Sequence, residues 1–202
     1  MPRYLHTTLC AMLLLGLWPA VARAHVGGSD AGLMNGLMHP VFGLDHLLAM
    51  ISVGVVSAEL GGHSIWRVPL AFVGAMTVGG ALGIWQPTLT HVELGIAASV
   101  VTLGVGIVLA DRRTSPWPIT GLVLLFGACH GYVHGVEIPK SVSPALYTLG
   151  FVIGTAVLHI LGVVIGEVSA MQKRLSQGLR LAGGMVVATG VVFVLQSLGV
   201  IA

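Results

Sequence analysis

The chain has 202 residues, of which 55% are hydrophobic and only 8% are charged. Soluble domains carry about 25% charged residues, so the composition excludes an ordinary soluble protein and predicts an integral protein of the lipid bilayer. The net charge is only +2, and no patch of Lys and Arg interleaved with aromatic residues occurs, which excludes a nucleic-acid partner. Two cysteines are too few for a disulfide framework.

Residues 1–24 have the pattern of a secretory signal peptide: a positive start, a short apolar core and the cleavage signal Ala22-Arg-Ala24. Cleavage would leave His25 as the first residue, whose free amine and imidazole can together chelate a metal. The alternatives are an uncleaved first helix and a solvated His25. The expected division is a signal peptide over 1–24 and a single six-helix transmembrane domain over 25–202.

Six apolar segments follow, and each is long enough to cross a bilayer as a helix. Short connections with Gly, Pro and Ser separate them, and no soluble segment is large enough to fold alone. The sequence therefore predicts an all-α integral membrane protein, a six-transmembrane-helix bundle after a cleaved signal peptide. The expected limits of the spans are 32–58, 66–85, 92–110, 117–137, 145–168 and 179–200.

Lys and Arg are distributed unevenly between the two sets of loops. If the N-terminus is secreted, the loops on the inside hold six basic residues and those on the outside hold only Lys140. Basic loops stay in the cytoplasm, so we expect a multi-pass protein of the bacterial inner membrane with both mature termini in the periplasm. The six are Arg67, Arg112, Arg113, Lys173, Arg174 and Arg180.

The first span contains His39-Pro-Val-Phe-Gly-Leu-Asp45-His46. An ionisable residue at mid-membrane costs about 2.5–3.5 kcal/mol on insertion scales and so indicates a function. On one continuous helix His39 and His46 would share a face about two turns apart, while Asp45 could reach a neighbouring helix or orient a histidine. Imidazole plus carboxylate suits nickel, zinc or cobalt. The alternative is a pair of histidines that only hydrogen-bond between helices.

The fourth span carries His130, His134 and Glu137 on one continuous face, at i, i+4 and i+7. Glycines 127, 131 and 135 form a small-residue stripe beside that face, which lets another helix approach closely. With alternating orientations, this cluster lies at the same depth as the cluster of the first span. We therefore expect both clusters to converge in one metal site between spans one and four, with Glu137 nearer its mouth.

The fifth span adds His159, with Thr155 one turn earlier on its face. Taken alone, this pair is more typical of a His–Thr hydrogen bond than of a metal site, but we count His159 among the candidate metal residues. Glu93 and His91 lie near a span end and are expected to be interfacial, although they could gather ions at a mouth. Cys129 precedes His130 and points about 100° away from it, so we expect it to pack rather than to bind metal.

These motifs resemble the hydrogenase/urease accessory HupE/UreJ family of nickel permeases, and the resemblance covers essentially the whole chain. The family pattern of the first span matches His39, Pro40, Gly43, Asp45 and His46; that of the fourth matches His130, Gly131, His134, Gly135 and Glu137; and the Leu-His of the fifth matches Leu158-His159. Cys129 and Val133 stand where phenylalanine and alanine are expected, a change that leaves the ligands in place and could alter the shape of the pocket.

The resemblance implies an inner-membrane permease for Ni²⁺ that supplies hydrogenase or urease maturation, with no permanent cofactor and no enzymatic activity. Some relatives are associated with cobalt, so Co²⁺ is an alternative cargo, and a metal-binding accessory protein that does not transport is a further alternative. The chain has no nucleotide-binding Gly-x4-Gly-Lys loop. An intramembrane metalloenzyme would need more histidine boxes than the chain has. Homo-oligomerisation is left open.

Overall fold

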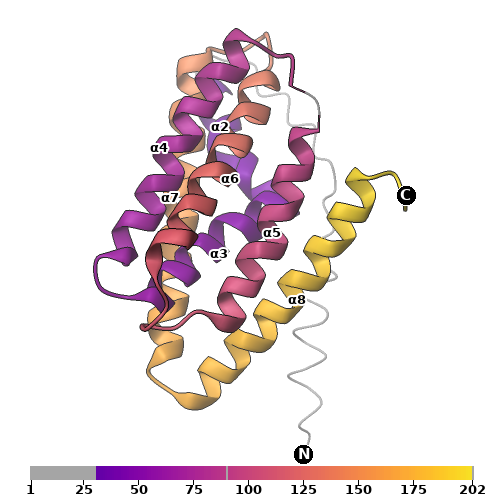
Figure 1. The fold of residues 1–202 in the computed structure, drawn as a ribbon. Coiled ribbons are helices and arrows are strands. Elements are labelled where there is room, and N and C mark those ends of the chain that lie inside the picture. The colour runs from indigo at the N-terminus through magenta and orange to yellow at the C-terminus, as the bar shows by residue number, and fades with distance from the viewer. Residues whose placement is uncertain (1–30, 90, 202) are drawn as a thin grey trace, which may run out of the picture.

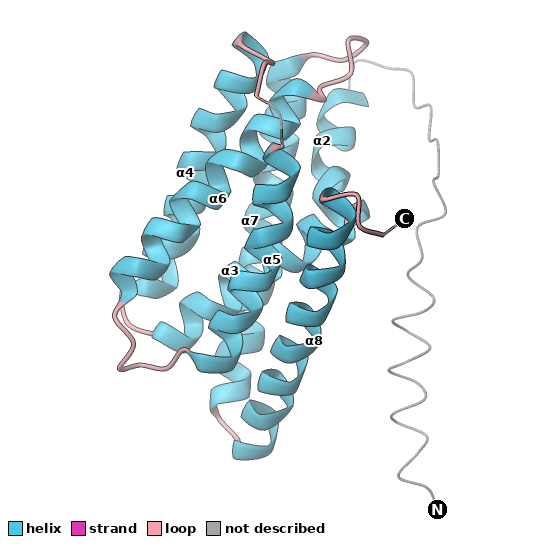
Figure 2. Cartoon of the chain, turned by 45° about the vertical axis from the view of Figure 1, so that its right-hand side comes forward, coloured by secondary structure: helices cyan, strands magenta, loops and turns pink. Residues whose placement is uncertain are grey.

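The computed structural model describes residues 31–89 and 91–201, and this part of the chain consists of helices joined by short loops, without a strand (Figures 1 and 2). The proposed signal peptide and His25 lie outside the described residues, so cleavage and the role of His25 remain predictions. The helices are α2 (Ala31–Phe42), α3 (Leu44–Leu60), α4 (Ser64–Trp85), α5 (Val92–Leu109), α6 (Pro116–Val136), α7 (Pro144–Ala170) and α8 (Lys173–Ser197).

The helices account for up to six membrane crossings. Five of them, α4 to α8, are each long and apolar enough to span a bilayer, and α2 with α3 forms a sixth, bent crossing. Large apolar side chains such as Leu70 and Val157 point outward, as lipid contact requires. Exposed tryptophans lie at helix ends, with Trp66 and Trp117 at one end of the bundle and Trp85 at the other. The prediction of an all-α membrane bundle is confirmed.

The first crossing is broken, and the expectation of one continuous helix over 32–58 is wrong. The chain turns by 82° between α2 and α3 at Gly43, whose backbone is extended with φ −89° and ψ 115°. Pro40 lies inside α2 three residues before the break, where it removes one N–H from the helical hydrogen-bond ladder. His39 therefore belongs to α2 and His46 to α3.

The glycine stripe of α6 packs against α4. A Cβ added at Gly131 would collide with the carbonyl of Met76, and one added at Gly135 would collide with the carbonyl of Gly80. The expected close approach is confirmed, and the helix that approaches is α4. The histidine face of α6 is thereby left to turn towards α2 and α3.

The other helices pair in the same close manner. Both α2 and α3 pack on α7. A Cβ added at Gly150 of α7 would collide with the carbonyl of Leu33, and one added at Gly162 would collide with the carbonyl of Ile51. Helix α8 packs chiefly on α5 at the edge of the bundle (Figure 1), and within α8 only Gly183 and Gly190 are buried.

The two ends of the bundle differ in charge. We call the end where α3 finishes and α4 begins the basic end, because it carries Arg67 and the Arg112-Arg113 pair, together with Lys173 and Arg174 where α8 begins. The opposite end, where α6 finishes and α5 and α7 begin, carries Glu93, Glu137 and Lys140. The histidine motifs of α2, α3 and α6 lie in the half of the bundle nearer this opposite end.

Candidate metal centre

Three imidazoles from three helices converge. His39 of α2, His46 of α3 and His134 of α6 each offer a ring nitrogen, and these nitrogens all lie within 4.8 Å of one another. The ring of His134 has its centroid 4.6 Å from that of His39 and 4.5 Å from that of His46. Around one ion with metal–nitrogen bonds of about 2.1 Å, ligand nitrogens lie about 3 to 4 Å apart. A small rotation of the rings is therefore enough to bind a single ion.

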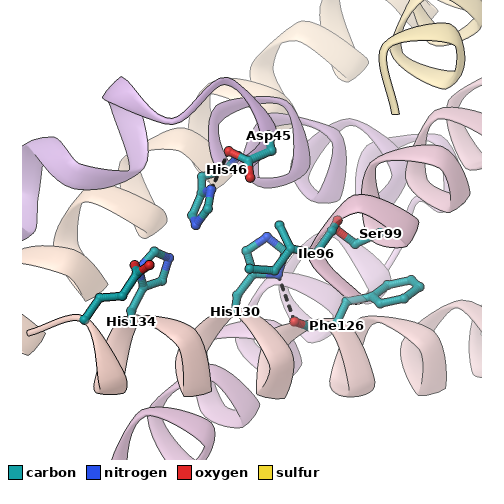
Figure 3. A network of polar contacts seen from close by, with 8 residues as sticks. Asp45, His46, Ile96, Ser99, Phe126, His130 and His134 are labelled. Atoms are coloured by element: carbon teal, nitrogen blue, oxygen red, sulfur yellow. Dashed lines mark hydrogen bonds and ion pairs between the residues drawn. The ribbon is translucent and has the colours of Figure 1, made fainter. Parts of the chain in front are cut away.

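His130 lies one turn before His134 on α6, and its ring centroid is 5.3 Å from that of His46. Its Nδ1 is 2.9 Å from the carbonyl oxygen of Phe126. A carbonyl can only accept a hydrogen bond, so Nδ1 carries the proton and Nε2 keeps its lone pair. His130 thus presents Nε2 as a fourth donor beside the three converging rings, and Figure 3 shows it next to two of them, His46 and His134.

Asp45 orients His46 instead of facing the other rings. Its Oδ1 lies 2.6 Å from Nδ1 of His46 and also accepts the backbone N–H of His46 at 2.9 Å. The carboxylate fixes the proton on Nδ1, so the Nε2 lone pair of His46 points towards His130 and His134 (Figure 3). Histidines that bind metal ions are commonly held by such a carboxylate partner. Of the two roles open to Asp45 in the sequence, the geometry shows the orienting one.

The cluster leaves buried ring nitrogens without hydrogen-bond partners. His46 and His130 each have a free Nε2, and both nitrogens of His134 are unpaired. Leaving a buried polar atom unsatisfied costs about 1–3 kcal/mol. A bound cation with open coordination positions would satisfy several of them at once, which a packing role for these histidines does not do.

Aromatic residues of α7 form a wall of the cluster. The Phe151 ring lies 4.2 Å from that of His134, and the Tyr147 ring lies 5.9 Å from that of His39, centroid to centroid. Both aromatic side chains are buried. The wall limits the movement of the imidazoles and separates the cluster from lipid on this side.

An acid-lined hollow reaches the cluster from the opposite end. It has a volume of about 340 Å³, and its lining includes Asp45, His46, Glu93 and Glu137. Glu93 and Glu137 are exposed, Asp45 is half-buried and His46 is buried, so the hollow runs from the surface to the imidazoles. Glu137 caps α6 and lies 3.8 Å from Nδ1 of His134. Burial raises the pKa of the Glu137 carboxyl.

His159 stands apart from the cluster. The Phe72 ring lies 5.2 Å from the His159 ring and 5.4 Å from the His130 ring, centroid to centroid. The expected His–Thr hydrogen bond is wrong, because Thr155 donates to the sulfur of Met76 at 3.8 Å and both ring nitrogens of His159 lack a partner.

Cys129 lies on the side of α6 that packs against α5. A Cβ added at Gly95 of α5 would lie 2.8 Å from its sulfur. It is half-buried and has no place among the converging nitrogens. Cys129 packs beside Gly95, as expected, and its having no part in metal binding stays a prediction.

Two residues near the histidines, Glu93 and Phe72, were not predicted from the sequence to belong to the site. Glu93 was expected to be interfacial, and only the shared hollow connects it with Glu137 and His46. Its position in the first turn of α5, at the end where α6 finishes, was the signal that could have raised its weight. A phenylalanine in an apolar span carries no such signal.

Comparison with known proteins shows to which family the chain belongs. Residues 11–193 match the family described as HupE / UreJ protein. The chain belongs to the HupE/UreJ family. It is 42% identical to "Protein HupE" of Rhizobium leguminosarum bv. viciae over 188 residues, which cover 91% of this chain and 93% of the relative. No solved structure matches. Both histidine motifs of this HupE/UreJ chain and His159 fall inside the matched residues, and the apolar helices make it a multi-pass membrane protein.

Proposed function

We propose that this HupE/UreJ protein is a permease that carries Ni²⁺ across the bacterial inner membrane into the cell, where the metal supplies hydrogenase or urease maturation. The observation that carries the proposal is the convergence of His39, His46 and His134 beside an acid-lined hollow that reaches His46. A structural histidine cluster needs no connection to the surface, whereas a transport site does.

The donor set favours a first-row divalent metal over Mg²⁺ or Ca²⁺. Imidazole nitrogen suits nickel, cobalt, copper and zinc, whereas magnesium and calcium prefer shells made only of oxygen. The converging atoms are nitrogens, and the nearest carboxylate, Asp45, is engaged with His46. Cobalt has the same preference for these donors, so Co²⁺ is the alternative cargo.

The geometry also suits release of the ion. Three nitrogens with a fourth nearby leave coordination positions for water, and an ion in transit must bind weakly enough to leave. We propose that the membrane potential or the metal gradient drives the ion. A cation that enters from a positive exterior gains about 2.3 kcal/mol per charge per 100 mV.

The proposed direction of metal transport follows from the difference in charge between the two ends of the bundle. The basic end carries Arg67, Arg112 and Arg113 and therefore corresponds to the cytoplasmic side. The hollow with Glu93 and Glu137 then opens to the periplasm, where it meets incoming cations. Both mature termini lie on that side in this proposal.

Uptake of radioactive nickel into proteoliposomes that contain only this protein tests the proposal. We expect uptake by the unmodified protein and a loss of at least tenfold in His46→Ala. The matched control is His63→Ala, because His63 is exposed at the basic end. Nickel binding without uptake by the unmodified protein would instead show an accessory metal-binding protein, and the absence of both would overturn the proposal.

A further inference from the structure

We call His39, His46, His130 and His134 the outer cluster. Beyond it, a single aromatic ring separates two buried imidazoles. Phe72 of α4 lies between His130 of α6 and His159 of α7: its ring is tilted by 60° to the former and nearly perpendicular, at 84°, to the latter. Phe72 and His130 are fully buried, and His159 is 2% exposed. Within the described residues, this ring contacts the innermost histidine of the outer cluster and also His159.

His159 has the properties of a metal ligand without a metal-binding cluster around it. Neither of its ring nitrogens has a hydrogen-bond partner, although the side chain is buried. Two further donor atoms lie close to its helix face. Thr155 stands one turn earlier on α7, and its hydroxyl contacts the sulfur of Met76. An imidazole with a hydroxyl and a thioether nearby is an incomplete but suitable set for a soft or borderline cation.

His159 also lies nearer to the basic end than the outer cluster does. It lines a hollow of about 130 Å³ between α4 and α7, together with Ile65, Trp66 and Pro69. These three residues belong to the first two turns of α4, which begins at the basic end. An ion that passed Phe72 from His130 to His159 would therefore have moved towards the cytoplasmic side.

The packing holds the backbones of Phe72 and His159 in place. A Cβ added at Gly127 of α6 would lie 2.6 Å from the carbonyl oxygen of Phe72, so α6 holds α4 closely at this residue. A Cβ added at Gly54 of α3 would collide with the carbonyl of His159, so α3 holds α7 in the same way. Rotation about the side-chain bonds of Phe72 needs no movement of these contacts.

We propose that His159 is a second, inner metal station and that the Phe72 ring is the gate between it and the outer histidine cluster. The proposal rests on the proposed function, because it concerns the path of the same ion. The Phe72 ring is fully buried and lies against both imidazoles, and apolar constrictions of this kind gate ion paths by excluding water. An ion leaves His130 and reaches His159 only when the ring turns aside.

The first test compares His159→Cys with His159→Ser. The two side chains have nearly the same size, but only the cysteine thiolate is a strong ligand for nickel. We expect the serine variant to lose at least tenfold in the initial rate of nickel uptake and the cysteine variant to recover a large part of it. Leu161→Ala, a lipid-facing change two residues along α7, is the control. Equal uptake by the cysteine and serine variants would overturn the role of His159 as a ligand.

Nickel binding to the purified variants shows whether the two stations are separate. Equilibrium dialysis in detergent should find that His159→Ser retains the binding of the outer cluster, with a change in affinity of less than threefold. Loss of all binding in a monodisperse His159→Ser protein would overturn a separate station. Absence of binding and uptake in the unmodified protein would instead overturn the proposed function.

The second test measures the gate directly. In a chain with Cys10 and Cys129 replaced by Ala, His159→Cys places a thiol behind the Phe72 ring. A small, membrane-impermeant thiol reagent added from the periplasmic side should react at least tenfold faster when Phe72→Ala is also present. Val78→Ala, a lipid-facing change on the same helix, should leave the rate unchanged. An equal rate with and without Phe72→Ala would overturn the gate, and this readout does not depend on transport.

Discussion

The imidazole rings of His39 and His46 lie 6.0 Å apart, centroid to centroid, although seven residues separate them along the chain. On a straight helix the same separation spans about 10.5 Å along the axis. The 82° turn between α2 and α3 brings the rings together and leaves space for His134 between them. The break in the first crossing is therefore what makes a three-histidine cluster possible.

A substitution at the break should weaken the site. In Gly43→Ala the new Cβ would lie 3.1 Å from both Oδ1 of Asp45 and Nδ1 of His46, so this pair must shift. We expect the KM for nickel uptake to rise about fivefold to tenfold, because His46 no longer points at the other rings. Gly74→Ala is the matched control, since nothing lies within 4 Å of its new Cβ. An unchanged KM in Gly43→Ala would mean that the Asp45–His46 geometry is not critical.

Asp45→Asn tests the orienting role of the carboxylate. The amide has the same size and its oxygen can still accept from Nδ1 of His46, but it lacks the charge that holds the proton there. Carboxylate partners of ligating histidines are worth about 10–100-fold in metal affinity, so nickel affinity measured by dialysis should fall in this range while some uptake remains. If Asp45→Asn abolished binding as fully as removal of His46, the aspartate would be a direct ligand instead.

Cargo selectivity should follow the nitrogen donors. Nickel uptake should resist a large excess of magnesium and be inhibited by cobalt and copper, because only the latter two prefer imidazole. Cys129→Ala should leave uptake unchanged, since the thiol packs against Gly95. Competition assays with radioactive nickel measure both effects. Strong inhibition by magnesium would indicate a site made only of oxygen and would remove the histidines from the mechanism.

Uptake should fall as the external pH is lowered. Imidazoles bind metal only in the neutral form, so protons compete with the ion for these ring nitrogens. Glu137 acts in the same direction: burial raises its pKa, so it loses its charge at a higher pH than an exposed glutamate does and then attracts cations less. Initial uptake rates between pH 5 and 8 should show one decline towards acid.

Glu137→Gln isolates the contribution of the carboxyl to this decline. The variant should have lower uptake at neutral pH and a shallower fall between pH 6 and 5, because the charge at the mouth is already absent. A pH profile of the same shape as that of the unmodified protein, merely scaled, would assign the whole decline to the histidines.

Much of the bundle could be predicted from the sequence, because long apolar segments and the Lys and Arg content of the loops identify membrane spans and their orientation. The residues of the cluster were found as well, since His39, His46 and His134 are polar groups in apolar surroundings. The break at Gly43 could not be predicted, because a Pro inside a long apolar segment does not determine whether the helix bends slightly or turns by 82°.

The pairings between helices could not be predicted from the sequence for a different reason. The period of Gly127, Gly131 and Gly135 shows that α6 has a face for a close neighbour, but it does not name the neighbour. The structure shows that α4 takes that face. Likewise, nothing in the order of residues distinguishes Phe72 from other apolar side chains until His130 and His159 are seen on either side of it.

The packing of α2 and α3 on α7 has a consequence for biogenesis. The ribosome releases α2 and α3 first among the described helices, and α7 follows only after α4, α5 and α6 have been made. The first crossing therefore enters the bilayer with two imidazoles and a carboxylate but without the helix that shields it. A nascent chain arrested before Pro144 would lack Tyr147 and Phe151 and would leave the histidines open to lipid, which makes it a natural substrate for membrane quality control.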